Sequence, residues 1–227
     1  MKNKLEISPV MMSVFLGGCF LALIVFLFCW HLRQSELSYL GERESVLRGD
    51  LEQLNTWGKW TVDYVKISRV IDHLSRHKLS EESRQMLTEQ IWQISRSYSI
   101  DPLLILAVVA QESHGNPQAR GRVRSGKESG AMGLMQIKLE TAQNMAQHFN
   151  LTIETAEDLM KPEVNVAVGS AYLIRLIGKY GKVKEALIAY NLGHSAVDRM
   201  LERGQELPTR YYERVISKYN DLARLSF

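Results

Sequence analysis

Cysteine is nearly missing from this chain of 227 residues, which has only Cys19 and Cys29. Both lie in one apolar stretch near the N-terminus, and no cysteine follows Trp30. The rest of the chain therefore has neither a disulfide framework nor a thiolate metal site. His73 and His77 would share a helix face, but no third ligand accompanies them, so we expect a solvated face there and no metal site.

A large excess of one charge is missing as well. The 28 basic and 25 acidic residues give a formal net charge of +3. Residues 1–33 hold three basic residues and one acidic residue, so 25 basic and 24 acidic residues remain, a net of +1. Such a chain lacks the basic face that polyanions require, and we expect no nucleic acid as partner. It also lacks a phosphate-binding glycine loop, and we expect no cofactor.

One long apolar run interrupts this pattern, at residues 10–32 (VMMSVFLGGCFLALIVFLFCWHL). It meets the length of about 20 residues that a helix needs to cross the hydrocarbon core. A cleaved signal peptide would need small residues at a cleavage site after the run, and none follow. The string from Leu16 to Cys19 resembles a lipoprotein signal, but strongly apolar residues follow Cys19, where a lipoprotein turns polar. We therefore predict an uncleaved transmembrane anchor.

The flanks of the run predict its orientation. Lys2 and Lys4 favour a cytoplasmic N-terminus at 1–9, although Arg33 weakens the asymmetry. The bulk of the chain would then lie outside the cytoplasm.

Residues 33–78 have no proline and little glycine, which predicts a helical stalk. Its leucines follow steps of three and four residues, interrupted at Glu44: Leu37, Leu40, Leu47, Leu51 and Leu54. A stripe this short favours an amphipathic helix that packs on its own domain or on the membrane surface. A stalk that forms a homodimer is the alternative.

From residue 79 to 227 the pattern predicts a mainly α domain. Asp101-Pro102 is a strong helix start, and the segment after it (LLILAVVAQES) is apolar nearly all round, as in a buried helix. Further helices are expected at 139–149, 164–179, 183–191 and 211–219. A small hairpin at 118–132 is the most β structure that we expect.

Glu112 lies at the end of that buried helix. A carboxylate there is poorly solvated, which favours its neutral form and should raise its pKa. A carboxyl group with a raised pKa is suited to act as a general acid near neutral pH.

Several motifs accompany Glu112 in a fixed order. They are SIDPLLILAVVAQESHGNP (99–117), GAMGLMQI (130–137), MKPEVNVAVGSAYL (160–173) with EALIAYNLG (185–193), and PTRYYERV (208–215). On these motifs, residues 98–220 resemble the transglycosylase domain of the soluble lytic transglycosylase type, which is related to goose-type lysozyme. The resemblance covers a little over half of the chain and excludes the anchor and stalk.

The resemblance implies a lysozyme-like fold and a lytic transglycosylase activity on the glycan strands of bacterial peptidoglycan. Glu112 would be the single catalytic acid and base, where most glycosidases use two carboxylates. It would cleave the β-1,4 bond between N-acetylmuramic acid and N-acetylglucosamine without water, leaving 1,6-anhydro-muramoyl ends. With the anchor, this places a single-pass protein in the bacterial inner membrane, its catalytic domain in the periplasm.

The resemblance also implies roles for other residues. Ser113 would orient Glu112 or contact the sugar, and Gln136 would bind an N-acetylated sugar together with the backbone around Met135. The Tyr190 hydroxyl would tune or position the carboxyl group. Two further residues would complete the cleft: Asn191 in its wall and Tyr212 facing the groove. The side chains of Met135 and Tyr212 could equally belong to the core.

The chain departs from the family pattern at three places. Lys138-Leu139 follows Gln136-Ile137 where many relatives have Met-Pro, and Lys138 could meet a peptide or muramoyl carboxylate. Pro208 stands where a glutamate often precedes Thr-Arg. The basic loop 120–127 could hold acidic stem peptides, although a solvated loop is the simpler interpretation.

Two other functions stay open at this stage. One is a hydrolytic muramidase, in which water replaces the sugar hydroxyl. The other is a glycan-binding assembly factor of an envelope-spanning secretion or conjugation machine.

Overall fold

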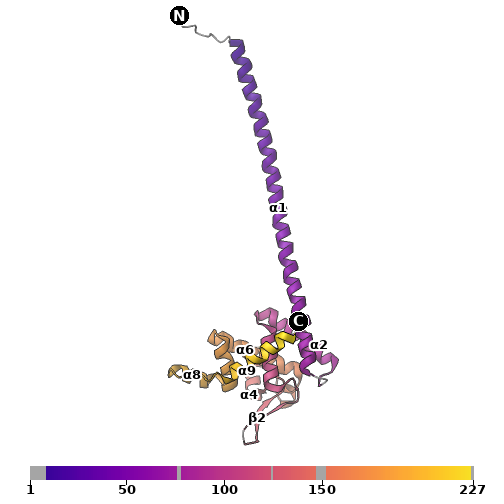
Figure 1. Cartoon of the computed structure of the whole chain (residues 1–227), viewed down its shortest axis with the longest axis vertical. Coiled ribbons are helices and arrows are strands. Elements are labelled where there is room, and N and C mark those ends of the chain that lie inside the picture. The colour runs from indigo at the N-terminus through magenta and orange to yellow at the C-terminus, as the bar shows by residue number, and fades with distance from the viewer. Residues whose placement is uncertain (1–8, 76–77, 124, 147–151, 226–227) are drawn as a thin grey trace. The chain divides into compact units, whose positions relative to one another are not determined.

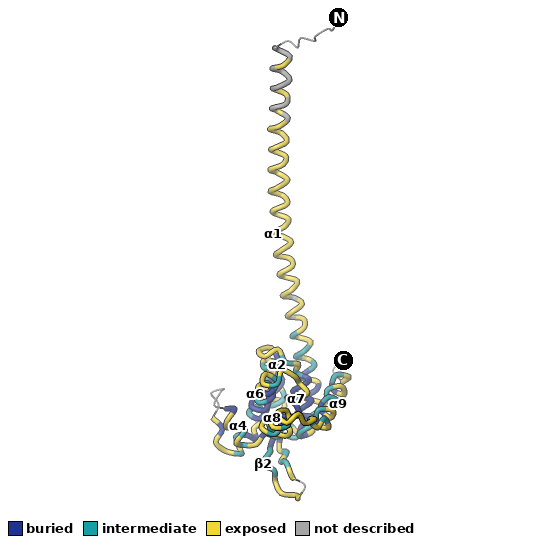
Figure 2. The backbone as a smooth tube through the Cα atoms, turned by 90° about the vertical axis from the view of Figure 1, so that its left-hand side faces the viewer, coloured by how far each residue is buried: buried dark blue, intermediate teal, exposed yellow. Residues whose placement is uncertain are grey.

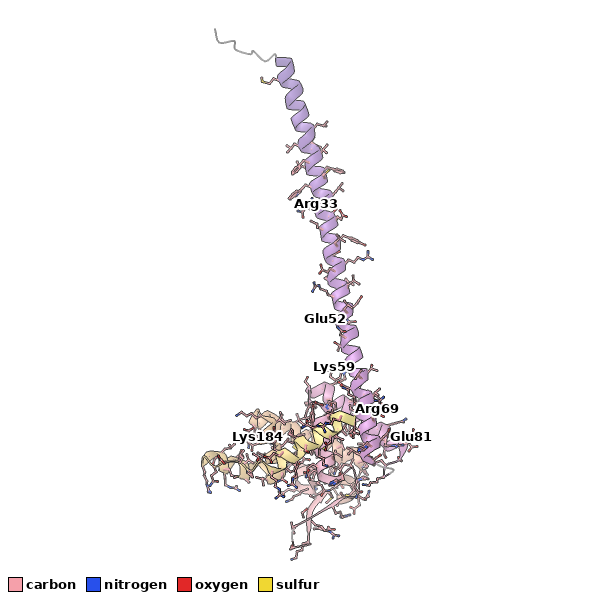
Figure 3. All side chains as sticks on the ribbon, viewed as in Figure 1. Arg33, Glu52, Lys59, Arg69, Glu81 and Lys184 are labelled. Atoms are coloured by element: carbon pink, nitrogen blue, oxygen red, sulfur yellow. The ribbon has the colours of Figure 1, made fainter. Side chains whose placement is uncertain are left out.

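The computed structural model describes residues 9–75, 78–123, 125–146 and 152–225. The chain divides into two units, residues 1–59 and 60–227. Helix α1 (Pro9–Ser75) makes up the described part of the first unit and contributes its last turns to the second. In the first unit the described side chains are exposed, including Arg33 and Glu52 (Figures 2 and 3). Glu44, which interrupts the leucine stripe, binds Arg48 one turn later at 2.8 Å.

The predicted membrane span at 10–32 lies within α1. Several of its side chains, among them that of Cys19, lie outside the described residues. Within the described part of the chain, no helix has an apolar stretch long enough to cross a bilayer. The structure therefore does not support the predicted anchor.

The last turns of α1 belong to the second unit, because Ile67, Val70 and Ile71 are buried in its core. The sequence had assigned these residues to the stalk, since the helical pattern continues without a break. The helix itself shows no break, and the division between the two units falls between Lys59 and Trp60. His73 is exposed, and His77 lies outside the described residues.

The described part of the second unit is mainly helical, as predicted. Its helices after α1 are α2 (Glu81–Tyr98), α3 (Pro102–Ser113), α4 (Leu139–Ala146), α5 (Ala156–Leu159), α6 (Pro162–Tyr180), α7 (Val183–Leu192), α8 (His194–Glu202) and α9 (Arg210–Leu225). Polar caps begin several of them: Ser80 accepts from the Ser83 N–H, and Asp101 from the Leu103 N–H. The sequence patterns missed α5 and α8.

A small antiparallel sheet interrupts the helices between α3 and α4. Its strands β1 (Arg120–Arg122), β2 (Glu128–Met132) and β3 (Ile137–Lys138) lie in that order. The predicted hairpin corresponds to β1 and β2, whereas β3 was not predicted. β3 pairs two residues with β2, Met132 with Ile137 and Ala131 with Lys138, which is too short a segment for an alternating pattern.

Helix α3 forms the centre of the core, and its residues 103–110 are all buried. It packs against α9, while α6 packs against α2 and α7 (Figure 1). A surface helix buries only one stripe, so an all-apolar helix can be accommodated only when neighbours cover it on every side. The burial of α3 therefore determines where Glu112, near its C-terminal end, comes to lie.

Candidate active site

Glu112 is positioned by the two ends of α3. Pro102 occupies the first turn, and the helix stops at His114, which has a left-handed backbone (φ 51°). Gly115 follows with φ 69°, and a Cβ atom there would come within 2.3 Å of the Leu74 carbonyl oxygen. The chain thus turns away immediately after Glu112, which leaves the carboxyl group half-buried at the edge of the core.

Burial raises the pKa of the Glu112 carboxyl group above its ordinary value of 4.5. Two weaker effects lower it, a hydrogen bond from Tyr211 and the positive charge of Arg214. The Tyr211 hydroxyl donates to Oε1 of Glu112 at 2.5 Å. Among the residues that the structure describes, the groups that lower the pKa of this carboxyl are a phenol and a guanidinium, and no second carboxylate shifts it.

Tyr211 was not among the predicted site residues. Its side chain is only 6% exposed, and it lies on α9, the helix that packs against α3. Burial and the negative charge of Glu112 raise the pKa of its phenol well above the ordinary value, so it stays a hydrogen-bond donor. The spacing of Tyr211, Val215 and Leu222, the buried residues of α9, could have identified it, since all three share one helix face.

Tyr212, the tyrosine that was predicted, is half-buried and packs against the hydrophobic core of the unit. Adjacent helical residues point about 100° apart, so Tyr211 and Tyr212 cannot both face Glu112.

Tyr190 lies near Glu112 but binds elsewhere. Its hydroxyl donates to the Met135 carbonyl oxygen at 2.9 Å, and its ring lies 5.5 Å from that of Tyr172. Burial, and then the negative charge of Glu112, raise the pKa of Tyr190 well above its ordinary value. Tyr190 thus ties α7 to the segment that contains Met135, and Tyr211 makes the contact with the carboxyl group that was expected of Tyr190.

Met135 is fully buried. Its backbone is held on both sides, since its N–H donates to Asn165 Oδ1 at 2.7 Å and its carbonyl accepts from Tyr190. Ser170 donates to its sulfur at 3.8 Å. Of the two interpretations left open for this side chain, the structure favours a place in the core.

Gln136 has a left-handed backbone (φ 49°) and a half-buried side chain. Its Nε2 donates to the carbonyl oxygens of Ala119, at 3.0 Å, and Gly133, at 2.8 Å. The amide therefore ties together the two chain segments that flank β1 and β2.

Ser113 and Asn191 differ in their surroundings. Ser113 is buried, and its hydroxyl donates to the Val109 carbonyl of its own helix at 3.1 Å. This contact engages the hydroxyl within its own helix. Asn191 is exposed near the end of α7, one residue after Tyr190.

Asn165 is a second residue that the sequence interpretation did not single out, although it lies inside a quoted motif. It is fully buried on α6, and its side chain makes three hydrogen bonds, from the Met135 N–H and to the carbonyls of Met132 and Leu159. A buried amide satisfied in this way holds the loop after β2 against α6.

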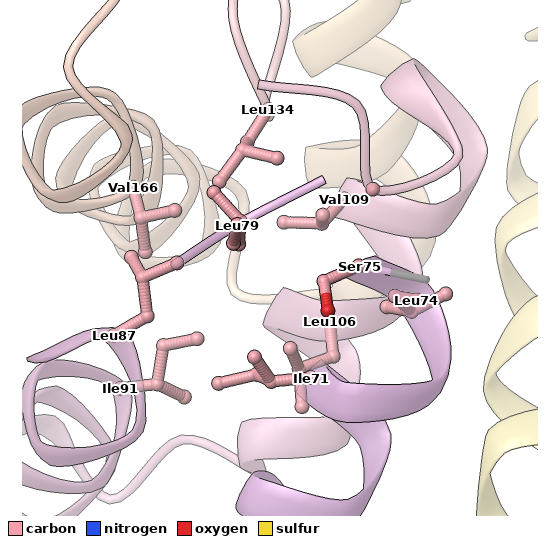
Figure 4. Close-up of a pocket in the computed structure, with 11 residues that line it drawn as sticks. Ile71, Leu74, Ser75, Leu79, Leu87, Ile91, Leu106, Val109, Leu134 and Val166 are labelled. Atoms are coloured by element: carbon pink, nitrogen blue, oxygen red, sulfur yellow. The ribbon is translucent and has the colours of Figure 1, made fainter. Parts of the chain in front are cut away.

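Two further observations limit what the site can bind. Among the described residues, no three His, Cys, Asp or Glu side chains gather where a metal ion could bind. A small apolar cavity of about 20 Å³ lies in the core of the second unit, where Ile71, Leu106 and Leu134 are among its lining (Figure 4). None of the described residues that line this cavity is ionisable, so Glu112 is the better candidate for the chemistry.

Comparison with known proteins is consistent with this site. The family model described as the transglycosylase SLT domain matches residues 89–212, which include Glu112, Tyr190 and Tyr211. A transglycosylase of Enterobacteria phage PRD1 is 37% identical over 105 residues, 46% of this chain and 34% of its own. A candidate soluble lytic murein transglycosylase of Haemophilus influenzae is 30% identical over 148 residues, 65% of this chain and 23% of its own. The chain thus spans about a third or less of these relatives.

Solved structures also resemble part of the chain. The lytic transglycosylase Slt of Pseudomonas aeruginosa overlaps 61% of this chain and 22% of its own, with 22% identity and a TM-score of 0.43. The 70-kDa soluble lytic transglycosylase of Escherichia coli overlaps 68% and 24%, with 21% identity and a TM-score of 0.45. The family assignment depends on the family model and not on these partial overlaps.

Proposed function

Because the chain belongs to the transglycosylase SLT domain family, we propose that it is a lytic transglycosylase of peptidoglycan, with Glu112 as its catalytic acid and base. The observation that carries the proposal is one half-buried carboxyl group with a raised pKa, held by the Tyr211 phenol. A protonated carboxyl group near neutral pH can give a proton to a leaving oxygen.

The proposed reaction needs no water. Glu112 protonates the glycosidic oxygen between N-acetylmuramic acid and N-acetylglucosamine, and the bond from that oxygen to muramoyl C1 breaks. The Glu112 carboxylate then takes the proton from the muramoyl C6 hydroxyl, whose oxygen forms a bond to C1. The 1,6-anhydro-muramoyl end forms, and Glu112 is protonated again. A nucleophile within the same sugar has a high effective concentration, so a second carboxylate is not required.

The surrounding residues support this scheme in different ways. Tyr211 holds the carboxyl group, while Tyr190 and Asn165 hold the backbone of Met135 from two sides. We propose that Gln136 and Asn191 line the glycan cleft. Ser113, Met135 and Tyr212 would contribute by packing.

The test compares the chain with its Glu112→Gln variant on purified sacculi, followed by mass spectrometry of the released muropeptides. We expect 1,6-anhydro-muramoyl products from the unaltered chain and a loss of about 10²- to 10⁴-fold in the variant. Glu202→Gln changes an exposed glutamate of α8 in the same way and should keep full activity.

Other products would replace the proposal by a defined alternative. Reducing-end products would make the protein a muramidase. Binding to sacculi without any product would favour the glycan-binding assembly factor of a secretion or conjugation machine.

Attachment to the bacterial inner membrane, with the second unit in the periplasm, is a proposal from the sequence of residues 10–32 alone. Alkaline carbonate extraction of membranes tests it: an anchored chain stays in the pellet, and a chain without residues 1–32 is released. Release of both chains would refute the anchor. Chemical cross-linking of the full chain tests the stalk homodimer in the same membranes.

A further inference from the structure

Helix α9 is bound to α3 at both ends by hydrogen bonds of one kind, from a tyrosine phenol to a carboxyl group. At the C-terminal end of α3, Tyr211 donates to Oε1 of Glu112. At the N-terminal end, the Tyr219 hydroxyl donates to Oδ2 of Asp101 at 2.5 Å. The two bonds lie about three turns apart on α3 and about two turns apart on α9. The helices therefore run antiparallel, and each end of α3 has its own bond to α9.

Asp101 uses its two carboxylate oxygens for different partners. Oδ1 accepts from the Leu103 N–H at 2.9 Å, which caps the first turn of α3. Oδ2 accepts from Tyr219, and this bond raises the pKa of the Tyr219 phenol to about 12, so the phenol stays a donor at neutral pH. The residue that begins the helix of Glu112 thus also binds α9.

Tyr219 lies on the same face of α9 as Tyr211. The residues of this face follow steps of four, four and three positions, as Tyr211, Val215, Tyr219 and Leu222. Tyr219 packs against the core beside its buried neighbours, although its bond to Asp101 lies at the surface. Apolar contacts are non-directional, whereas a hydrogen bond requires a distance and an angle. A bond at each end therefore specifies the axial position and rotation of α9 on α3, which we call its register.

The register of α9 bears directly on Glu112. Among the described residues, both groups that lower the pKa of Glu112 come from α9, namely Tyr211 and Arg214. Tyr190 of α7 also interacts electrostatically with Glu112, but its phenol binds the Met135 carbonyl oxygen. A hydrogen bond weakens steeply as its angle departs from linear, so a small shift of α9 would weaken the contact from Tyr211.

We propose that Tyr219 is a positioning residue: through its bond to Asp101 it holds α9 in the register that brings the Tyr211 phenol to Glu112. Tyr219 acts from the opposite end of α3 and does not contact the reacting groups. This inference rests on the function proposed above only in taking Glu112 as the group that reacts.

The experiment removes the Tyr219 hydroxyl alone, with Tyr219→Phe in the full chain. The matched control is Tyr180→Phe, which removes a phenol–carboxylate bond of the same kind, to Asp198 at 2.8 Å, from between α6 and α8. A second variant, Asp101→Ser, keeps an oxygen that can cap α3 but is too short to bind Tyr219 as well. The pKa of Glu112 is measured by carboxyl ¹³C NMR titration, with Glu112→Gln to assign the signal, and kcat and KM are measured on sacculi.

We expect Tyr219→Phe to raise the pKa of Glu112, in the same direction as Tyr211→Phe but by less. The value of kcat should fall about threefold while KM changes less than about twofold, because the bound sugar is not contacted. Asp101→Ser should have the same effects, and Tyr180→Phe should match the unaltered chain. In a Tyr211→Phe background, Tyr219→Phe should change the pKa of Glu112 no further, because the contact that it positions is already gone.

Three results would overturn the inference. An unchanged or lower pKa of Glu112 in Tyr219→Phe would mean that the register does not depend on this bond. The full effect in a Tyr211→Phe background would mean that Tyr219 acts only through the stability of the fold. An equal effect of Tyr180→Phe would mean that any lost phenol bond suffices. If the unaltered chain releases no product from sacculi while the pKa shift is observed, the proposed reaction fails and the role of Tyr219 stands.

Discussion

The phenol of Tyr211 donates a hydrogen bond of 2.5 Å to Oε1 of Glu112, a residue 99 positions earlier in the chain. The contact joins α9 to the end of α3. It lowers the pKa of the carboxyl group, whereas burial raises that pKa. Burial favours the protonated form of Glu112, whereas the phenol and Arg214 favour the carboxylate. The balance suits a group that has to give a proton and take one back within a single turnover.

Replacement of Tyr211 by phenylalanine removes the hydrogen bond that lowers the pKa of Glu112. The pKa should then rise further, and the alkaline limb of the pH profile of kcat/KM should move to higher pH, because the acid form persists longer. The rate at the optimum should fall by about tenfold, because the carboxyl group is no longer held.

Tyr212→Phe is the matched control for this change, one residue along the same helix and half-buried. It should leave the pH profile in place. An unchanged profile for Tyr211→Phe, or a shift to lower pH, would contradict the role of Tyr211.

Glu112→Gln should stabilise the fold at neutral pH while it abolishes activity. The folded-state pKa of Glu112 is raised by burial, so ionisation in the folded protein is unfavourable above that pKa. Wild type is therefore fully stable below the ordinary value of 4.5 and loses stability as pH rises through the folded-state pKa. The neutral amide avoids that loss.

The expected gain at pH 8 is on the order of 1 kcal/mol. This corresponds to about 2–4 °C in Tm for a domain of 150–250 residues. At pH 4 the two proteins should melt together. Thermal melts of both at the two pH values measure this, and equal Tm differences at pH 4 and pH 8 would rule out the buried charge as the cause.

Gly133→Ala should destabilise the second unit more than Gly130→Ala does. The two glycines have nearly equal backbone angles, φ 77° and φ 78°, so an alanine is strained at both by about 1 kcal/mol. A Cβ atom at Gly130 meets open space, whereas at Gly133 it comes within 2.2 Å of the Asn165 side-chain nitrogen. Asn165 cannot move aside without losing its three hydrogen bonds.

The free energy of unfolding, from urea titrations, should therefore fall by about 3 kcal/mol or more for Gly133→Ala and by about 1 kcal/mol for Gly130→Ala. Equal losses of unfolding free energy would show that the Asn165 side chain can move aside. That result would contradict its role in holding the loop after β2.

Gly169→Ala and Gly178→Ala should have effects of opposite sign, although both lie in α6. Gly178 is exposed with nothing near the position of a Cβ atom, so alanine should stabilise the helix by about 0.5–1 kcal/mol. At Gly169 a Cβ atom would lie 2.5 Å from the Met135 sulfur and 2.7 Å from its Cβ atom. The overpacked core should cost about 1–3 kcal/mol.

Gly169→Ala should also reduce activity, because a displaced Met135 draws away the carbonyl that Tyr190 binds. Urea titrations and product assays on the same two variants measure both effects. Full activity in a destabilised Gly169→Ala variant would show that the position of Met135 does not affect the active site.

The sequence alone determined the helical character of the second unit and the position of Glu112. Periodicity and end signals are local: Asp101-Pro102 begins α3, and continuous apolar residues require that α3 be buried. Very short or closely spaced elements were not predicted, because these local signals are weak there. β3 has only two residues, and only Gly193 separates α8 from α7, so no clear turn signal marks where α8 begins.

Only the tertiary structure decided which side chains meet Glu112. Tyr211 and Tyr212 are the same residue type at adjacent positions, and the rotation of α9 against α3 selects one of them. Likewise, whether Met135 faces solvent or the core depends on Gly169, which lets α6 approach it, and on Asn165, which holds its backbone. Local sequence specifies the period of a helix, but its phase relative to a neighbour is set by the packing of side chains far apart in the chain.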